Sequence, residues 1–147
     1  MTYGISEVAE KVDLSPYTLR FYEKEGLLPF LERDSNGRRM FTERDLEWIV
    51  LIGCLKATGM PIKEIKQFID WYTEGDETLA LRQNMFYERK RAVEEKMAML
   101  QKTMDMVTYK CWFYDVAVEA GTADAPKAIS ADDLPSEIRT LKKNIGL

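Results

Sequence analysis

The side chains best suited to chemistry in this chain are cations and hydroxyls in its first half. The segment YTLRFYEK, residues 17–24, places hydroxyl, guanidinium and ammonium groups at helical spacing, and two arginines follow a segment rich in turn residues. Such groups donate hydrogen bonds to phosphate oxygens and to the edges of bases. We therefore expect a DNA-binding surface made of Tyr17, Thr18, Arg20, Tyr22, Lys24, Arg38, Arg39, Phe41, Lys56 and Lys63.

Catalytic groups are scarce in the same sequence. There is no histidine, and we find neither a glycine-rich phosphate loop nor a nucleophile with a recognisable base. The two cysteines, Cys54 and Cys111, stand far apart and form no CxxC motif. We therefore expect no enzyme activity, no cofactor, no metal site, and free thiols in a reducing compartment.

Charge and hydropathy limit the function further. The chain has 21 basic and 25 acidic residues and a formal net charge of -4, so its total charge does not indicate a nucleic-acid partner. A DNA-binding surface therefore requires that the cations gather on one face and that Glu7, Glu10, Glu43 and Glu47 lie elsewhere. There is no long apolar run and no signal-peptide pattern, so we expect a cytoplasmic protein without a membrane partner.

Two short helices are expected to position residues 17–24. Apolar residues at helical spacing predict the first helix over residues 5–12. Ser15 suits the N-cap of the second helix, and Pro16 suits its first turn. Two helices joined by a tight turn form a helix-turn-helix, whose second helix enters the major groove of DNA.

A hairpin is expected next. Residues 30–31 and 40–41 have strand character, and Asn36 and Gly37 between them give the strongest short signal for a hairpin turn. The two arginines just past this turn are within reach of phosphates or of a minor groove. The sequence therefore predicts a two-stranded wing.

Two helices are expected after the wing. Thr42 suits the N-cap of the first, and its predicted apolar stripe consists of Leu46, Ile49, Val50, Gly53, Cys54 and Ala57. Residues 58–61, TGMP, interrupt the helix, and Ile62 begins the second. The start of this second helix presents backbone N–H groups to a phosphate, with Lys63 and Lys56 nearby.

A long helix is expected from Phe86 onward. Steps of three and four residues lead from there to residue 114, and eight of the nine positions are apolar; Lys90 is the exception. This spacing is typical of a coiled-coil seam, which needs a partner to bury it. We expect a homodimer whose interface comprises Phe86, Val93, Met97, Leu100, Met104, Val107, Cys111 and Tyr114.

Several spaced motifs together resemble one known family. LRFYEKEGLL, GRRMF, TERDLEWI and GMPIKEI follow one another in the order found in the MerR family of bacterial transcription regulators, and the resemblance covers residues 3 to roughly 115. It implies a mainly α protein: a winged helix-turn-helix DNA-binding domain over residues 1–75, and a long antiparallel coiled-coil dimerisation helix over residues 76–118. Residues 119–147 are expected to form a C-terminal tail with one short helix.

The resemblance also implies a mechanism. Members of this family bind double-stranded promoter DNA at an inverted repeat, and an effector-bound form distorts the spacer so that RNA polymerase, an indirect partner, finds its two elements aligned. Metal-sensing members carry ligand cysteines at the start of the dimer helix and in the loop after it. Here residues 76–78 are Asp, Glu and Thr, and residues 120–125 contain no cysteine. A thiolate metal site of that kind therefore lacks its ligands.

Cys54 is a candidate sensor of a different kind of effector. Its setting, LIGCLKATGM, resembles a subgroup of the family that responds to reactive aldehydes and other thiol-modifying stress. A thiol beside Lys56 and near helix ends favours the thiolate, which electrophiles attack. Cys54 also falls on the predicted apolar stripe, however, where a buried cysteine acts as a small inert hydrophobe. The sequence leaves both roles open.

Two further alternatives remain. The methionines at 97, 99, 104 and 106, with the aromatic residues 112–114, suit either core packing or a small hydrophobic ligand at the dimer interface. An architectural DNA-binding protein without an inducer has the same DNA-binding surface. Salt-dependent binding without sequence preference distinguishes this last reading from a regulator.

Overall fold

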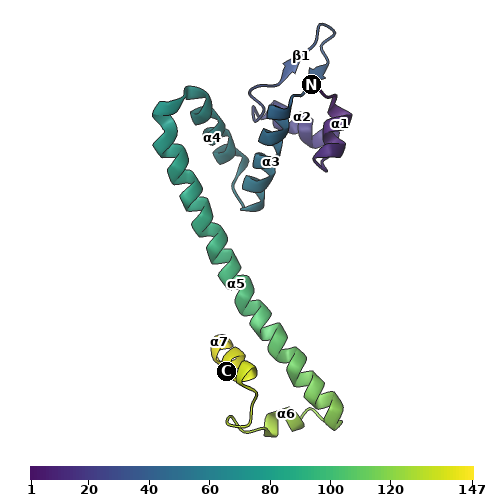
Figure 1. Ribbon diagram of the computed structural model, residues 1–147, viewed down its shortest axis with the longest axis vertical. Helices are drawn as coiled ribbons and strands as arrows, with labels where there is room; N and C mark the ends of the chain where they lie inside the picture. Colours follow the sequence, from purple (N-terminus) through teal and green to yellow (C-terminus); the bar gives the residue numbers. More distant parts are fainter. The chain divides into compact units, whose positions relative to one another are not determined.

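The computed structural model describes residues 1–147, which divide into two compact units, Met1–Ala92 and Val93–Leu147. The chain is mainly helical with one small two-stranded sheet, as expected (Figure 1). Its elements, in order, are α1 (Ile5–Lys11), α2 (Pro16–Lys24), β1 (Glu32–Arg33), β2 (Arg39–Met40), α3 (Glu43–Ala57), α4 (Ile62–Glu74), the 3-10 turn η1 (Asp76–Thr78), α5 (Leu79–Ala120), α6 (Ala125–Ala128) and α7 (Ser136–Ile145).

The turn between α1 and α2 is fixed by local hydrogen bonds. Asp13 adopts the left-handed conformation, with φ at 52°, and the Leu14 N–H donates to the Ala9 carbonyl at 2.9 Å. Ser15 caps α2, because its hydroxyl accepts a hydrogen bond from the Thr18 N–H at 3.1 Å. The second helix of the helix-turn-helix therefore begins where the sequence predicts.

The wing is an antiparallel pair in which Glu32 lies opposite Met40 and Arg33 opposite Arg39. The Asp34 carboxylate holds the turn by accepting from the backbone N–H groups of Asn36 at 2.9 Å and Arg38 at 2.8 Å. The strand predicted at residues 30–31 was wrong, because β1 begins two residues later. Phe30 instead packs against Trp48 and Tyr72, with ring centroids 5.9 Å apart in both pairs.

The predicted apolar stripe of α3 was also wrong. Of its six members only Ile49 is buried; Val50 and Cys54, for example, are exposed. Nearly every residue from 46 to 57 is apolar or small, so the spacing does not select one face. The face that is buried carries Asp45, Trp48, Ile49, Ile52 and Leu55.

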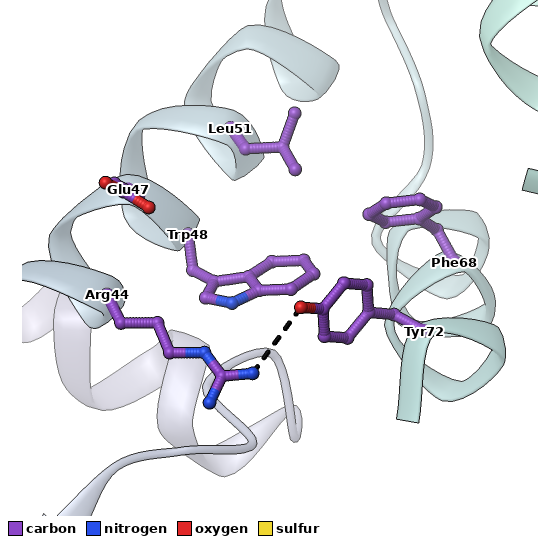
Figure 2. Close-up of a pocket in the computed structure, with 6 residues that line it drawn as sticks. All are labelled: Arg44, Glu47, Trp48, Leu51, Phe68 and Tyr72. Atoms are coloured by element: carbon purple, nitrogen blue, oxygen red, sulfur yellow. Dashed lines mark hydrogen bonds between the residues drawn. The ribbon is translucent and has the colours of Figure 1, made fainter. Parts of the chain in front are cut away.

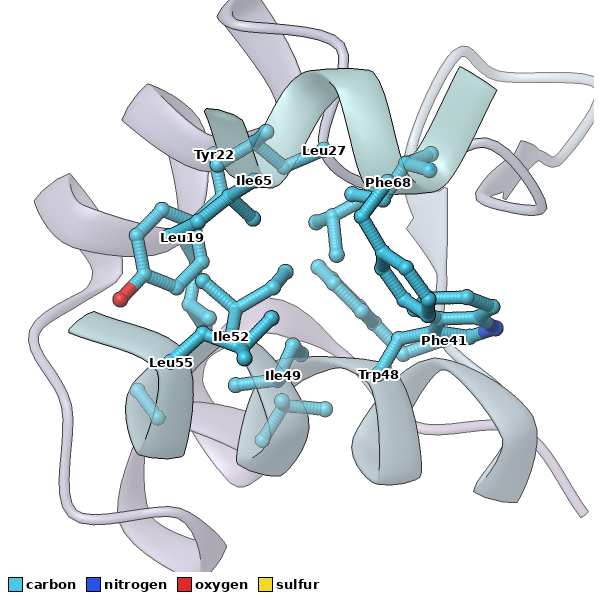
Figure 3. Packing of buried hydrophobic residues seen from close by; sticks show 14 of the residues in the cluster. Leu19, Tyr22, Leu27, Phe41, Trp48, Ile49, Ile52, Leu55, Ile65 and Phe68 are labelled. Carbon is cyan, nitrogen blue, oxygen red and sulfur yellow. The ribbon is translucent and has the colours of Figure 1, made fainter. Parts of the chain in front are cut away.

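The core of the first unit joins α1, α2, α3 and α4. Figure 3 shows Leu19 and Tyr22 of α2 and Ile65 and Phe68 of α4 around the buried face of α3. Thr42 and Asp45 cap α3 reciprocally: the Asp45 carboxylate accepts from the Thr42 N–H at 2.8 Å, and the Thr42 hydroxyl accepts from the Asp45 N–H at 3.4 Å. This capping box satisfies the Asp45 carboxylate, which explains why a charged residue is buried here.

The second unit is built on the C-terminal part of α5. Its core consists of Tyr109, Phe113, Leu134 and Ile138, so the tail packs on the long helix through α7. Asp105 is buried beside this core and accepts hydrogen bonds from Gln101 at 2.8 Å and Asn144 at 3.1 Å. The tail contains α6 as well as the single helix predicted. The domain limits at residues 75 and 118 remain predictions.

Candidate nucleic-acid interface

The outer face of α2 carries the expected contact residues. Tyr17, Arg20, Phe21 and Lys24 line a shallow hollow of about 220 Å³, and Tyr17 is 77% exposed. The Thr18 hydroxyl lies 2.9 Å from that of Ser15, so it belongs to the helix cap. The helix therefore presents a phenol, a guanidinium and an ammonium group to solvent on one surface, as base and phosphate recognition requires.

Two of the expected contact residues are buried instead. Phe41 is 0% exposed and Tyr22 is 1% exposed, so the direct DNA contacts predicted for their side chains were wrong. Phe41 packs in the core of the first unit, and its backbone forms a bridge with Tyr3. The Tyr22 ring faces the same core, and its hydroxyl lies at the edge of the cluster in Figure 3. Both residues therefore belong to the core that supports the candidate DNA-binding surface.

Lys56 and Lys63 lie on the segments around the break between α3 and α4. The Lys56 ammonium group donates to the Tyr22 hydroxyl at 3.4 Å and lies 5.2 Å from the centroid of its ring. Lys63 is exposed in the first turn of α4. Their DNA contacts remain predictions.

The two wing arginines differ. Arg38 is exposed and lines a hollow of about 420 Å³ with residues 4–7 and Arg39. Arg39 is half-buried, and its Nε donates to the Glu23 carboxylate at 2.6 Å. The structure therefore places Arg38 at the surface and ties Arg39 to α2.

Glu23 was not predicted as part of this site. Its carboxylate also accepts from Arg33 at 2.7 Å. Burial by itself raises the pKa of Glu23, but the hydrogen bonds and positive charges of Arg39 and Arg33 outweigh burial and hold this pKa below its ordinary value. The sequence carries no clear signal for this cluster, because the arginines are 10 and 16 residues away from Glu23.

Cys54 is an exposed free thiol on α3. The expectation that it lies on a buried stripe is therefore corrected. Lys56 is two residues further along the same helix, and residues at this separation do not face each other. Its ammonium group contacts Tyr22. The predicted stabilisation of the Cys54 thiolate by Lys56 is therefore not seen.

An aromatic pocket of about 250 Å³ lies between α3 and α4 (Figure 2). Trp48, Leu51, Phe68 and Tyr72 line it together with Arg44 and Glu47. The Arg44 guanidinium stacks 3.4 Å over the ring of Phe30 and donates to the Tyr72 hydroxyl at 3.4 Å. Arg44 thus closes one end of the pocket, which the sequence did not predict because its walls come from two separate helices.

The predicted dimer seam lies largely on the surface. In the second unit one face of α5 packs on α7 through Tyr109 and Phe113. The seam face does not: Leu100 is 68% exposed, and the other exposed members of the seam are Phe86, Met97, Met104, Val107, Cys111 and Tyr114. Val93 is half-buried. A hollow of about 430 Å³ on this face is lined by Met106, Val107, Lys110, Cys111, Tyr114 and Asp115.

The structure contains no group of three or more His, Cys, Asp and Glu side chains placed to hold a metal ion. None of its helices combines the length and the apolar character needed to cross a membrane.

Comparisons with known proteins agree on one family. Residues 3–70 match the MerR HTH family regulatory protein, and residues 46–108 match the region described as MerR, DNA binding. An uncharacterized HTH-type transcriptional regulator of Haemophilus influenzae is 42% identical over 135 residues, which span 92% of this chain and 98% of that one.

Solved structures give the same answer. The crystal structure of HiNmlR, a MerR family regulator lacking the sensor domain, bound to promoter DNA, matches 85% of this chain and 99% of that chain at 44% identity and a TM-score of 0.77. A MerR family regulator of Bacillus thuringiensis matches 76% of this chain and 97% of that chain at 40% identity and a TM-score of 0.69. This chain belongs to the MerR family of DNA-binding transcriptional regulators.

Proposed function

We propose that this regulator acts as an antiparallel homodimer on a promoter with an inverted repeat. The observation that carries the proposal is the exposed apolar seam of α5, because an isolated helix leaves such residues in water. Two recognition helices held at a fixed separation read two half-sites.

The family resemblance implies antiparallel pairing, and the seam positions permit it. Their spacing is nearly the same when read in either direction from Leu100, so an antiparallel pair brings Val93 of one protomer opposite Val107 of the other. We would test this in a C54S/C111S background. Oxidation of the V93C/V107C variant should yield covalent dimers efficiently, whereas V93C alone should not. Efficient crosslinking by V93C alone would instead indicate a parallel pair.

Activation or repression of the promoter proceeds by distortion of its spacer DNA. Elastic estimates put the free-energy cost of such bending at about 1–6 kcal/mol. The additional protein–DNA contacts that the bend permits can offset this cost. A promoter fragment labelled at both ends reports it, because its fluorescence energy transfer changes when the bound protein switches state. Unchanged energy transfer under inducing conditions would contradict the proposed distortion of the spacer.

The inducing signal is a reactive aldehyde or another electrophile that modifies Cys54. Three facts support this: the thiol is exposed, its setting resembles that of the aldehyde-responsive subgroup, and a related regulator lacks a sensor domain. In such a regulator the DNA-binding unit or the long helix has to receive the signal. Adduct formation on α3 acts directly on the unit that carries the recognition helix.

In-vitro transcription tests this assignment. We expect an aldehyde to induce transcription with the native chain and with Cys111→Ser, but not with Cys54→Ser. Cys111 is the comparison because it is the other free cysteine of the chain and lies on the seam that the proposed dimer buries, away from α3. Induction that survives in Cys54→Ser would rule out the sensor role.

A second candidate effector is a small hydrophobic molecule at the dimer interface. The hollow around Met106, Val107 and Tyr114 on the exposed face of α5 supports it. In that case induction depends on these residues and is unaffected by Cys54→Ser. A purely architectural role is less consistent with the relatives, which are described as transcriptional regulators.

A further inference from the structure

We propose that Glu23 limits the sequence-independent affinity for DNA by keeping two arginines of the wing away from phosphates. This proposal rests on the DNA-binding function of the family and is independent of the inducer. Glu23 acts as a positioning residue: it fixes the wing on the recognition helix and limits the number of cations that reach DNA.

The geometry of the cluster shows how one carboxylate serves two partners. Arg39 Nε lies 2.6 Å from Glu23 Oε2, and Arg33 Nη2 lies 2.7 Å from Oε1. Each oxygen thus accepts from a different strand of the wing. Arg33 also donates through Nη1 to the Gly37 carbonyl at 2.8 Å, which ties the turn of the wing to the same cluster.

The wing needs this carboxylate for an electrostatic reason. Arg33 and Arg39 are direct cross-strand neighbours, and like charges at such positions repel each other. Glu23 lies between their charged groups, and its side chain is only 25% exposed, so solvent screens this interaction less than at an open surface. Without the carboxylate, the two guanidinium groups are left unpaired beside the recognition helix.

Unpaired arginines at this place have a predictable effect on DNA binding. Phosphate contacts raise the affinity for every sequence and carry no sequence information. With the cluster intact, Arg20 and Lys24 on α2 and Arg38 on the wing are exposed. Arg33 is exposed as well and Arg39 is half-buried, but Glu23 holds the guanidinium groups of both. Release of Arg33 and Arg39 adds contacts that do not discriminate, so the affinity for every duplex rises and becomes more salt-dependent.

The test compares Glu23→Gln with Glu25→Gln in the full chain. Glu25 is exposed at the C-cap of the same helix, so its variant removes the same charge and leaves the wing cluster intact. Dissociation constants are measured by fluorescence anisotropy at several salt concentrations. The probes are a duplex that the native protein selects from a random pool, and a scrambled duplex of equal length. Thermal melting verifies that each variant is folded.

We expect Glu23→Gln to bind the scrambled duplex several-fold more tightly than Glu25→Gln does. The slope of log K against log salt should steepen by about 1 to 2 for each protomer, since each added phosphate contact contributes about 0.9. The ratio of selected to scrambled affinity should stay close to the native value, because contacts that do not discriminate strengthen binding to both duplexes equally. The additional changes Arg33→Gln and Arg39→Gln, made in the Glu23→Gln chain, should return the slope to the native value.

Two results would overturn the proposal. Equal weakening of both duplexes, with a native salt slope, would mean that Glu23 only stabilises the fold. A loss confined to the selected duplex at one base pair, with scrambled binding unchanged, would mean that the carboxylate reads a base directly, as carboxylates do at cytosine.

Discussion

Arg82 Nε donates a hydrogen bond to Thr78 Oγ1 at 3.1 Å, and this contact closes the elbow between α4 and α5. The same arginine donates to the Gly75 carbonyl at 3.0 Å. The Thr78 hydroxyl donates to that carbonyl at 2.7 Å and is buried. Just beyond the elbow, Phe86 of α5 meets Phe68 of α4 edge to face, with ring centroids 5.2 Å apart. These contacts hold the first turns of α5 against α4 within the first unit.

Replacement of the buried hydroxyl should weaken the elbow. Thr78→Val keeps the shape of the side chain but leaves Arg82 Nε without its acceptor and removes the hydroxyl that donates to the Gly75 carbonyl. We expect a loss of about 1–3 kcal/mol in the free energy of unfolding. Urea unfolding measures it. Thr73→Val is the control, because the Thr73 hydroxyl donates to the Asp70 carbonyl from an exposed position. Equal losses in the two variants would show that burial at the elbow does not matter.

Gly26 should tolerate a side chain poorly. Its φ is +71°, and a Cβ there comes within 2.7 Å of Lys66 Cε. We expect Gly26→Ala to cost about 1–3 kcal/mol through the left-handed backbone. The displaced lysine is a flexible end that pairs with Asp70 at a half-exposed site, so its disturbance adds only about 0.5 kcal/mol.

Gly37→Ala separates these two contributions. Gly37 has a similar φ of +78° and nothing within 4 Å of the added Cβ. Thermal melting should therefore show a slightly smaller loss for Gly37→Ala. In a Lys66→Ala background the two glycine variants should become equivalent; a persistent difference would point to a cost other than Lys66.

Features set by neighbouring residues could be predicted from the sequence. The Ser15 cap, the turn at Asn36 and Gly37, and the capping box of Thr42 and Asp45 all depend on residues within four positions of each other. Propensity and hydrogen bonding operate over this range, so the pattern alone identifies them.

Features set by tertiary contacts could not be predicted. Most residues of α3 from Leu46 onward are apolar, so only the position of α4 decides that Trp48 is buried and Val50 is not. The role of Glu23 depends on strands 10 and 16 residues away. Tyr22 belongs to the predicted recognition helix, but its ring faces the core, which the residue type does not reveal.

The proposed dimer should depend on Leu100. Leu100→Glu places a charge in the middle of the apolar seam, where a paired helix cannot hydrate it. Sedimentation should then give the mass of a single chain, 17.1 kDa. Thr103→Glu adds the same charge at an exposed position off the seam and should leave the dimer intact. A dimer that persists in Leu100→Glu would refute the seam.

The ion pairs of Glu23 should make the stability of the first unit pH-dependent. The pKa of this carboxyl lies below its ordinary value of 4.5 in the folded chain. Its stabilising contribution is therefore complete above about pH 4.5 and is lost as the pH falls through the lowered folded pKa. Urea unfolding should show the native chain to be more stable than Glu23→Gln at pH 7, with the difference shrinking in acid. A constant difference would mean that the carboxylate charge is not responsible.

Arg20 and Arg38 should affect DNA binding in different ways. Arg20 lies on the exposed face of the recognition helix, where a guanidinium reads base edges, so Arg20→Ala should lower affinity for the selected duplex by about 1–3 kcal/mol and have less effect on a scrambled one. Arg38 lies exposed beside the turn of the wing, where phosphate contact is expected. Arg38→Ala should weaken binding to both duplexes and reduce the salt slope by about 1 for each protomer. Anisotropy titrations over a salt series separate the two, and identical effects would show that base and phosphate contacts are not divided between helix and wing in this way.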